Sequence, residues 1–170
     1  QRSIRAVFEG SWEKLAAAER ELFQRMSVFR GGFMREAAGE VAGASLRSLS
    51  RLVNKSFLLR NPNSGRYEIH ELLRQYAAER LEAEPDSATV AFEAHAAYFA
   101  KFMEQMLGAL RSKRQREALD EIEADIENIR SAWRYFTKQG RAEEMARIIV
   151  PLWYFLEIRC WYHAGLDLFR

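Results

Sequence analysis

Residues 67–77, which read YEIHELLRQYA, place a short alternating strand directly before an amphipathic helix, and the two meet at His70. Upstream, the turn-forming residues 61–65, NPNSG, join this strand to an earlier one, so we expect strands over 57–60 and 66–69. A helix capped by Ser45 and running to about Lys55 precedes the two strands. The order of helix, two-stranded wing and helix predicts a winged-helix domain.

Three more helices are expected before this region. Apolar residues at spacings of three to four predict an amphipathic opening helix that ends near Leu15. A second helix over 17–29 ends at Gly31 and Gly32, because glycine accepts positive φ at low cost. A short third helix over 34–41 ends at Gly43. The residues expected to face the core of the first two helices are Ile4, Val7, Phe8, Trp12, Leu15, Leu22, Phe23 and Met26.

The polar, helix-breaking residues 84–87 indicate a domain boundary, which divides the chain into 1–85 and 86–170. Everything after the boundary has the periodicity of helices. One apolar stripe runs over 98–110 and a second, heptad-like seam runs from Leu119 to Phe136. Gly140 then turns the chain into a helix over 142–157 that Pro151 should kink or shift, and a further helix is expected over 162–169.

Antiparallel helices joined by short turns favour an α-solenoid of tetratricopeptide type for 86–170, whose units bury their apolar faces against one another. The fold class we predict is therefore mainly α, a winged helix with a small wing followed by the first part of a tetratricopeptide-like domain. A scaffold that dimerises through the Leu119 to Phe136 seam is an alternative, but the seam stops at Gly140 and is short for a coiled coil.

The composition is that of an ordinary globular chain, with 48% hydrophobic and 29% charged residues among 170. No signal peptide is visible, and the longest apolar run, 148–156, is too short to span a bilayer, so we expect a soluble protein that contacts no membrane. A single cysteine, Cys160, agrees with a reducing cytoplasm. Because the sequence starts at Gln1 and stops inside an apolar segment, we expect a fragment of a longer protein.

We expect no catalytic or metal site. The sequence lacks a phosphate-binding loop, a dinucleotide-binding glycine motif, a zinc-protease motif and paired Cys-x-x-Cys. Neither His95 nor His163 stands in a recognisable catalytic context beside Cys160. Five carboxylates over 120–127 offer spacings that a hard cation accepts, but nothing completes a coordination shell, and the solvated face of a helix explains them.

Two basic features are candidate nucleic-acid or partner contacts. On the helix over 45–55, the residues Arg47, Arg51, Asn54 and Lys55 are expected to face away from Leu46, Leu49, Leu52 and Val53, as a DNA-reading helix requires. Against DNA binding stands a mild charge, 14 basic and 11 acidic residues up to Pro85. The second feature is the run Arg111 to Arg116, read either as a solvated loop or as a partner or phosphate site.

His70 has two interpretations on physical grounds. A histidine at a strand-to-helix junction often bonds the local backbone and has a structural role. It also stands where first-turn amides lack partners and the helix dipole favours negative charge, so it is well placed to contact an anion.

Several blocks of this sequence resemble the winged-helix segment of bacterial STAND signal-transduction ATPases, relatives of the NB-ARC ATPases that are predicted transcriptional regulators. The residues that carry the resemblance are 2–6 with Ser11 and Trp12, then 22–33, 52–56, and 66–67 with 69–77. Residues 123–133 with Leu152 and Trp153 resemble the start of the tetratricopeptide-like sensor that follows in such proteins. The resemblance covers nearly the whole chain.

The resemblance implies a switch. In this family a nucleotide-binding domain lies upstream, and the winged helix folds back over bound ADP so that a histidine reaches the β-phosphate. By position that histidine is His70, followed here by Glu71 where the related eukaryotic motif has aspartate. The fragment itself would hold no cofactor, while the parent protein would bind ADP or ATP.

The leading hypothesis is a non-catalytic regulatory module. It relays the state of an upstream nucleotide-binding domain to downstream helical repeats, in signal transduction or transcription regulation. An effector protein or a small-molecule signal is implied as a further partner. The alternatives are direct DNA binding through Arg47, Arg51, Asn54 and Lys55, and the helical protein–protein interaction scaffold.

Overall fold

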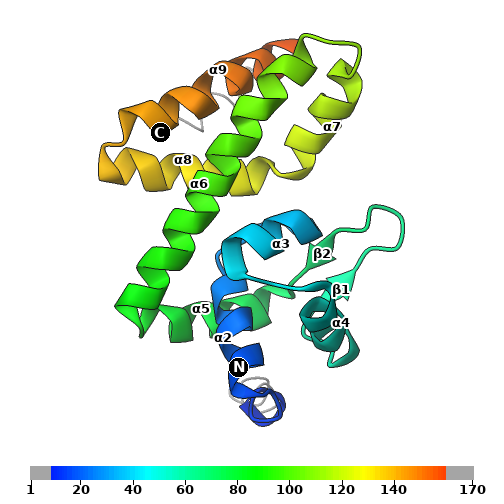
Figure 1. Cartoon of the computed structure of the whole chain (residues 1–170), viewed down its shortest axis with the longest axis vertical. Helices are drawn as coiled ribbons and strands as arrows, with labels where there is room; N and C mark the ends of the chain where they lie inside the picture. The colour runs from blue at the N-terminus through cyan, green and yellow to red at the C-terminus, as the bar shows by residue number, and fades with distance from the viewer. Residues whose placement is uncertain (1–8, 160–170) are drawn as a thin grey trace. The chain divides into compact units, whose positions relative to one another are not determined.

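The computed structural model describes residues 9–159 (Figure 1). These residues are mainly helical and include one two-stranded antiparallel sheet. The chain divides into two compact units between Phe92 and Glu93, here called unit 1 and unit 2. The division lies inside helix α6 (Pro85–Leu110), whereas the sequence-based boundary was placed where this helix begins.

Unit 1 begins its described part with a short helical turn that presents Trp12 and Leu15 to the core, at 7% and 2% exposure. The expected positions of Ile4, Val7 and Phe8 lie outside the described residues. Helix α2 (Ala17–Met26) then ends three residues before the position predicted from the sequence. Its C-cap, Ser27, donates its hydroxyl to the carbonyl of Gln24 at 2.6 Å, and this bond favours a turn over a further helical residue.

Two short helices follow as the turn residues predict. Helix α3 (Arg35–Ala42) ends at Gly43, whose φ of +74° is the left-handed value that glycine accepts. Helix α4 (Leu46–Asn54) starts at Ser45, whose hydroxyl accepts from the amide of Ser48 at 3.1 Å. Leu46 was expected on the buried face but is 56% exposed, because it is the first residue of α4. The buried face of this helix begins one turn later, at the fully buried Leu49.

The sheet is shorter than the sequence suggests. Strands β1 (Leu59–Arg60) and β2 (Tyr67–Glu68) pair with Leu59 opposite Glu68. The turn between them is closed by Asn61, whose side-chain oxygen accepts from the amides of Asn63 and Ser64. On its other side β2 pairs with a single residue, Phe33, which the sequence pattern did not reveal.

Helix α5 (Glu71–Glu82) begins directly after His70 and packs on α2, which also packs on α3. An aromatic cluster forms the centre of this packing. The ring of Trp12 meets those of Phe23 and Tyr76 edge to face, and Phe23 meets Phe57 in the same way. These contacts fix the direction of α5, and with it the position of the His70 junction.

Unit 2 contains the rest of α6 and helices α7 (Gln115–Ala124), α8 (Ile126–Gln139) and α9 (Ala142–Ile158). The heptad-like seam from Leu119 to Phe136 is divided between α7 and α8, because the helix breaks at Asp125. Both ends of the seam are buried inside the chain, Leu119 at 7% and Phe136 at 0% exposure. A continuous coiled-coil helix is therefore excluded over these residues.

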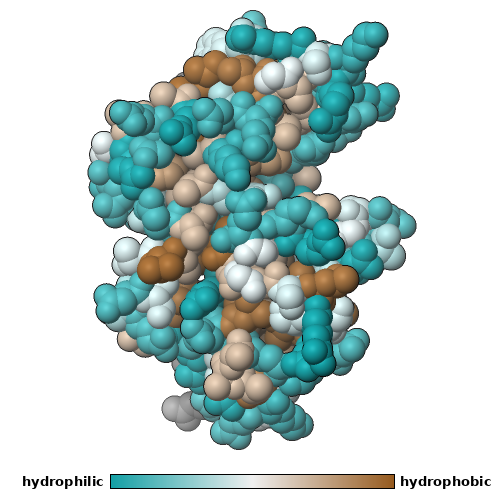
Figure 2. All heavy atoms as spheres, viewed as in Figure 1, coloured by the Kyte–Doolittle hydropathy of each residue, from teal (hydrophilic) through white to brown (hydrophobic). Residues whose placement is uncertain are grey.

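Helices α8 and α9 lie side by side after the turn at Gly140, whose φ is +66° (Figure 1). Pro151 lies inside α9 and does not shift the start of this helix, which remains near residue 142. The further helix expected over 162–169 lies outside the described residues. On the face shown in Figure 2, hydrophilic residues cover most of the surface and apolar ones form small areas. Between residues 9 and 159, no helix has the length and apolar character to cross a membrane.

Candidate functional site at the His70 junction

The strand-to-helix junction of unit 1 is tethered at both ends to one segment, residues 27–33. At the strand end, Phe33 and Tyr67 exchange two backbone hydrogen bonds of 2.8 and 2.9 Å. At the helix end, Arg74 donates from Nη1 to the carbonyl of Ser27 at 3.2 Å. His70 lies between these two tethers, so its position is defined by both.

His70 is exposed and is the N-cap of α5. Its Nδ1 accepts from the amide of Leu72 at 3.3 Å, and its carbonyl accepts from the amide of Arg74 at 3.0 Å. A neutral imidazole whose Nδ1 accepts carries its proton on Nε2. Nδ1 therefore caps the helix, which is the structural role considered from the sequence, and Nε2–H remains as a donor.

The carboxylate of Glu71 is already bound by neighbouring side chains. Its oxygens accept from Nε and Nη2 of Arg74 at 2.8 and 2.7 Å, and from the amide group of Gln75 at 2.9 Å. The hydrogen bonds from Arg74 lower the pKa of Glu71 to about 2, with smaller contributions from Gln75 and from the charge of Arg30. The carboxylate is thus ionised at neutral pH and already occupied.

A second guanidinium, that of Arg30, donates to backbone carbonyls at the same C-terminal end of α2. Its Nη1 lies 2.9 Å from the carbonyl of Ser27 and 3.1 Å from that of Phe29. Carbonyls after a helix C-terminus lack intrahelical donors and carry partial negative charge, which explains why two arginines gather there. Arg30 and Arg74 are therefore engaged in holding residues 27–29.

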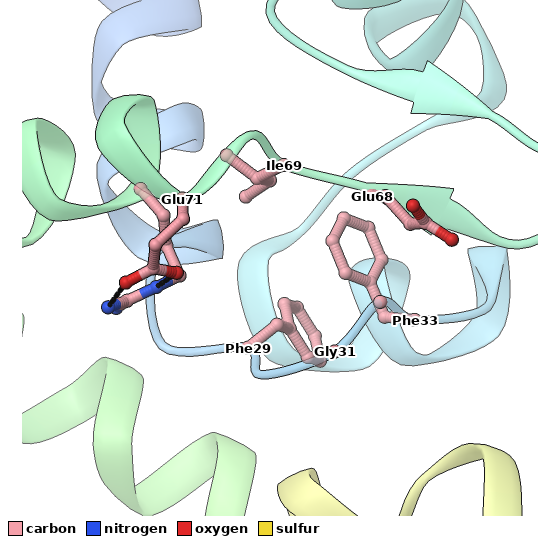
Figure 3. A pocket seen from close by; sticks show the side chains of 8 residues that line it. Phe29, Gly31, Phe33, Glu68, Ile69 and Glu71 are labelled. Carbon is pink, nitrogen blue, oxygen red and sulfur yellow. Dashed lines mark hydrogen bonds and ion pairs between the residues drawn. The ribbon is translucent and has the colours of Figure 1, made fainter.

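A cavity of about 280 Å³ lies between the segment and the junction. Figure 3 shows Phe29 and Phe33 on one side, Ile69 between strand and helix, and the Glu71 carboxylate bonded to an arginine. Gly32 is required here, since its φ is +96° and an added Cβ would lie 3.1 Å from the carbonyl oxygen of Tyr67. The full lining is Phe29, Gly31, Gly32, Phe33, Glu68, Ile69, Glu71 and Arg74.

The four residues suggested for DNA contact differ in their surroundings. Arg47, Arg51 and Asn54 are exposed on α4. Lys55 is the C-cap of that helix, and its Nζ lies 2.6 Å from the carboxylate of Glu19 on α2. Lys55 is therefore committed to a contact within unit 1, and the exposed polar face of α4 is carried by the other three.

Two basic residues of the run over 111–116 make contacts within unit 2. Arg111 donates to the hydroxyl of Tyr154 at 2.6 Å and lies over its ring. Arg114 pairs with Glu117 and with Glu121, at 2.9 and 3.2 Å. These bonds explain two of the four basic residues as parts of the fold.

The carboxylates over 120–127 form no metal centre. Arg159 lies 3.0 Å from Glu123 and also pairs with Asp120, while the Asp125 carboxylate accepts from Asn128 at 3.0 Å. Across residues 9–159, no three His, Cys, Asp or Glu side chains group as metal ligands.

Comparison with protein-family models, with curated proteins and with solved structures finds no match to this chain. The site is therefore defined by its own geometry. Arg74 and Ser27 were not identified from the sequence. The spacing of Glu71 and Arg74, three residues apart on a helix, signals their ion pair, but no sequence pattern signals the bond to Ser27. Cys160 and His163 lie outside the described residues.

Proposed function

We propose that this chain is a non-catalytic regulatory module of a STAND-type signal-transduction ATPase. Residues 1–85 act as its winged helix and the helices after it as the start of a tetratricopeptide-like sensor. In this proposal His70 contacts the β-phosphate of ADP held by an upstream domain, and exchange for ATP releases the module. The chain itself acts in the cytoplasm, performs no catalysis, and passes the nucleotide state to downstream helices, where an effector protein or a small-molecule signal is sensed.

The observation that supports the proposal is the state of the His70 ring. Its Nδ1 accepts from the Leu72 amide, which leaves the proton of the neutral ring on Nε2, and the residue is exposed. A ring N–H donor at a helix N-terminus suits a phosphate oxygen. Two groups nearby that bind phosphates well, Arg74 and Arg30, are occupied by Glu71 and by backbone carbonyls. The imidazole is the group left to recognise the anion.

Two substitutions separate anion recognition from helix capping. His70→Asn keeps a strong N-cap but removes the Nε2 donor, whereas His70→Ala removes both. In the longer protein that includes the upstream domain, both variants should weaken ADP binding about 10- to 100-fold, the value of one hydrogen bond to a charged group. ATP binding should be unchanged. Only His70→Ala should also lower the free energy of unfolding, by about 1 kcal/mol.

Isothermal titration calorimetry with ADP and ATP measures the first effect, and urea denaturation measures the second. Equal ADP affinity in the wild type and in His70→Asn would refute the proposal. So would steady ATP hydrolysis by the 170-residue chain alone. A parent gene without a phosphate-binding loop upstream of Gln1 would return DNA binding to first place.

DNA binding is the second candidate, because Arg47, Arg51 and Asn54 are all exposed on α4. Arginine and asparagine read guanine and adenine edges in the major groove. Fluorescence anisotropy with duplex DNA at two salt concentrations tests it. A DNA-binding α4 predicts a steep loss of affinity with salt, and Arg51→Ala should reduce the slope by about one charge. Arg25→Ala on α2 is the control, since Arg25 pairs with Glu21 away from α4.

A further inference from the structure

We infer that Arg74 is the residue that positions His70, and that Glu71 acts by holding the Arg74 guanidinium in place. This assigns a role to the residue after the histidine, which is glutamate here. The inference rests on the proposed function only for the identity of the anion that His70 meets, since the geometry of the positioning involves no nucleotide.

Arg74 contacts the junction in three ways. Its backbone amide donates to the His70 carbonyl at 3.0 Å, and its guanidinium binds both oxygens of Glu71. Its remaining amino group reaches the Ser27 carbonyl at 3.2 Å. The Arg74 side chain is only 13% exposed, whereas that of Glu71 is 60% exposed, so the bond to Ser27 is better shielded from water than the bonds to Glu71. One residue thus joins the first turn of α5 to the end of α2.

The second tether lies on the other side of His70. Tyr67 is fixed to Phe33 by two backbone bonds, and the residues between Tyr67 and α5 cross the edge of the cavity. Glu68 and Ile69 line that cavity, and His70, the next residue, is exposed. With the strand end fixed, the direction of the His70 ring depends on where the first turn of α5 is held, and Arg74 holds it.

Glu71 has a defined part in this arrangement. A guanidinium is planar and binds a carboxylate with two parallel bonds, which fixes the plane of the Arg74 head group. The third donor then points to Ser27. The carboxylate also neutralises the charge of Arg74. Because a guanidinium binds phosphate more strongly than an imidazole, this pairing keeps Arg74 from contacting the anion in place of His70. Removing the charge of Glu71 should therefore loosen the orientation of Arg74 and expose its donors.

The test uses the 170-residue chain and nuclear magnetic resonance of the imidazole nitrogens. The His70 signals are assigned by their loss in His70→Asn, because the chain has three histidines. In the wild type we expect the Nε2–H tautomer. Arg74→Met, which keeps the length of the side chain without its donors, should raise the Nδ1–H fraction at least about threefold, and Glu71→Gln should raise it in the same direction.

The matched control is Glu127→Gln on α8. Glu127 pairs with Arg130 three residues later at 2.8 Å, the same kind of pair in unit 2. It should leave the His70 tautomer unchanged. Should Arg74→Met fail to fold, Arg74→Lys keeps the charge but cannot reach Glu71 and Ser27 together, and it should show the same shift. A wild-type tautomer ratio in a folded Arg74 variant overturns the inference.

Titration with ADP in the longer protein, followed by the same His70 signals, separates this inference from the proposed function. If the tautomer depends on Arg74 but ADP never perturbs His70, the positioning stands and the nucleotide role fails. If ADP perturbs His70 equally in the wild type and in Arg74→Met, with an unchanged tautomer, the nucleotide role stands and the positioning fails.

Discussion

Lys55 and Glu19 join two helices of unit 1 through one ion pair, in which the Lys55 Nζ lies 2.6 Å from a Glu19 oxygen. The Glu19 side chain is 9% exposed and also accepts from the amide of Ala16 at 2.9 Å. The same carboxylate therefore caps α2 and anchors the end of α4. Lys55, which the sequence suggests as a DNA contact, thus also has a role within the fold.

The first prediction concerns this pair. Glu19→Gln should lower the free energy of unfolding by about 1 to 3 kcal/mol at pH 7, because it leaves Lys55 without its charged partner. Hydrogen bonds from Lys55 and Ala16 lower the pKa of Glu19. Because the pKa of Glu19 is lower in the folded state than in the unfolded state, its ionised carboxylate stabilises the fold above pH 4.5. This stabilisation is lost as the pH falls from 4.5 through the pKa of the folded state. In urea denaturation, the free energy of unfolding should differ less between pH 7 and pH 3 in Glu19→Gln than in the wild type.

The control for this prediction is Glu21→Gln, two residues along the same helix. Glu21 pairs with Arg25 on the surface, with 57% of its side chain exposed. Surface pairs of this type contribute about 0 to 1 kcal/mol. An equal loss of stability in both variants would show that the partly buried pair of Lys55 and Glu19 has no special role.

Much of unit 1 could be predicted from local signals. Ser45 and Gly43 mark helix ends because capping is decided by the residue itself. His70 was found as the start of α5 for the same reason. The early end of α2 and the break at Asp125 were missed, since the apolar spacing continues through both points.

Contacts between residues far apart in the sequence could not be predicted from such local signals. The single-residue bridge of Phe33 to Tyr67 has no periodicity to detect. The bond of Arg74 to Ser27 joins residues 47 positions apart. The site could thus be placed at His70 from the sequence, but the residues that hold it there required the fold.

The second prediction concerns the pKa of Glu71. Its carboxyl should titrate at about 2 in the wild type, because Arg74 and Gln75 donate to the ionised form. In Arg74→Met the pKa should rise towards 4.5, the ordinary value of a glutamate carboxyl. The stabilisation from this pair is present above pH 4.5 and is lost as pH falls towards 2. Carbon chemical shifts of the Glu71 carboxyl group, followed through an acid titration, provide the measurement, and an identical titration in both proteins would contradict it.

The third prediction concerns a buried polar chain in unit 2. Asn128 donates from its amide nitrogen to Asp125, which as a carboxylate only accepts, so its oxygen faces Nε2 of His95 at 3.2 Å. His95 and Asn128 are 1% and 0% exposed. Asn128→Ala should therefore lower the free energy of unfolding by about 2 to 4 kcal/mol, since it removes a partner from two buried polar groups.

Arg134→Ala is the matched control on the same helix. Arg134 is exposed on α8, and substitutions at such surface positions change stability by about 0.5 kcal/mol or less. Thermal and urea denaturation of both variants give the comparison. A loss below about 1 kcal/mol in Asn128→Ala would mean that water replaces the side chain and that these buried hydrogen bonds contribute little to stability.

The last prediction concerns Gly32, which lines the cavity at the strand-to-helix junction. Gly32→Ala should lower the free energy of unfolding at least about 1 kcal/mol more than Gly43→Ala does. Both glycines have positive φ, +96° and +74°, so both variants carry backbone strain. Only at Gly32 does the new methyl group meet backbone, 3.1 Å from the Tyr67 carbonyl, whereas at Gly43 it meets nothing within 4 Å. Because that carbonyl belongs to the Phe33 tether, Gly32→Ala should also perturb the His70 ring signals, and Gly43→Ala should leave them in place. Equal losses of stability together with unchanged His70 signals would show that the tether does not reach the junction.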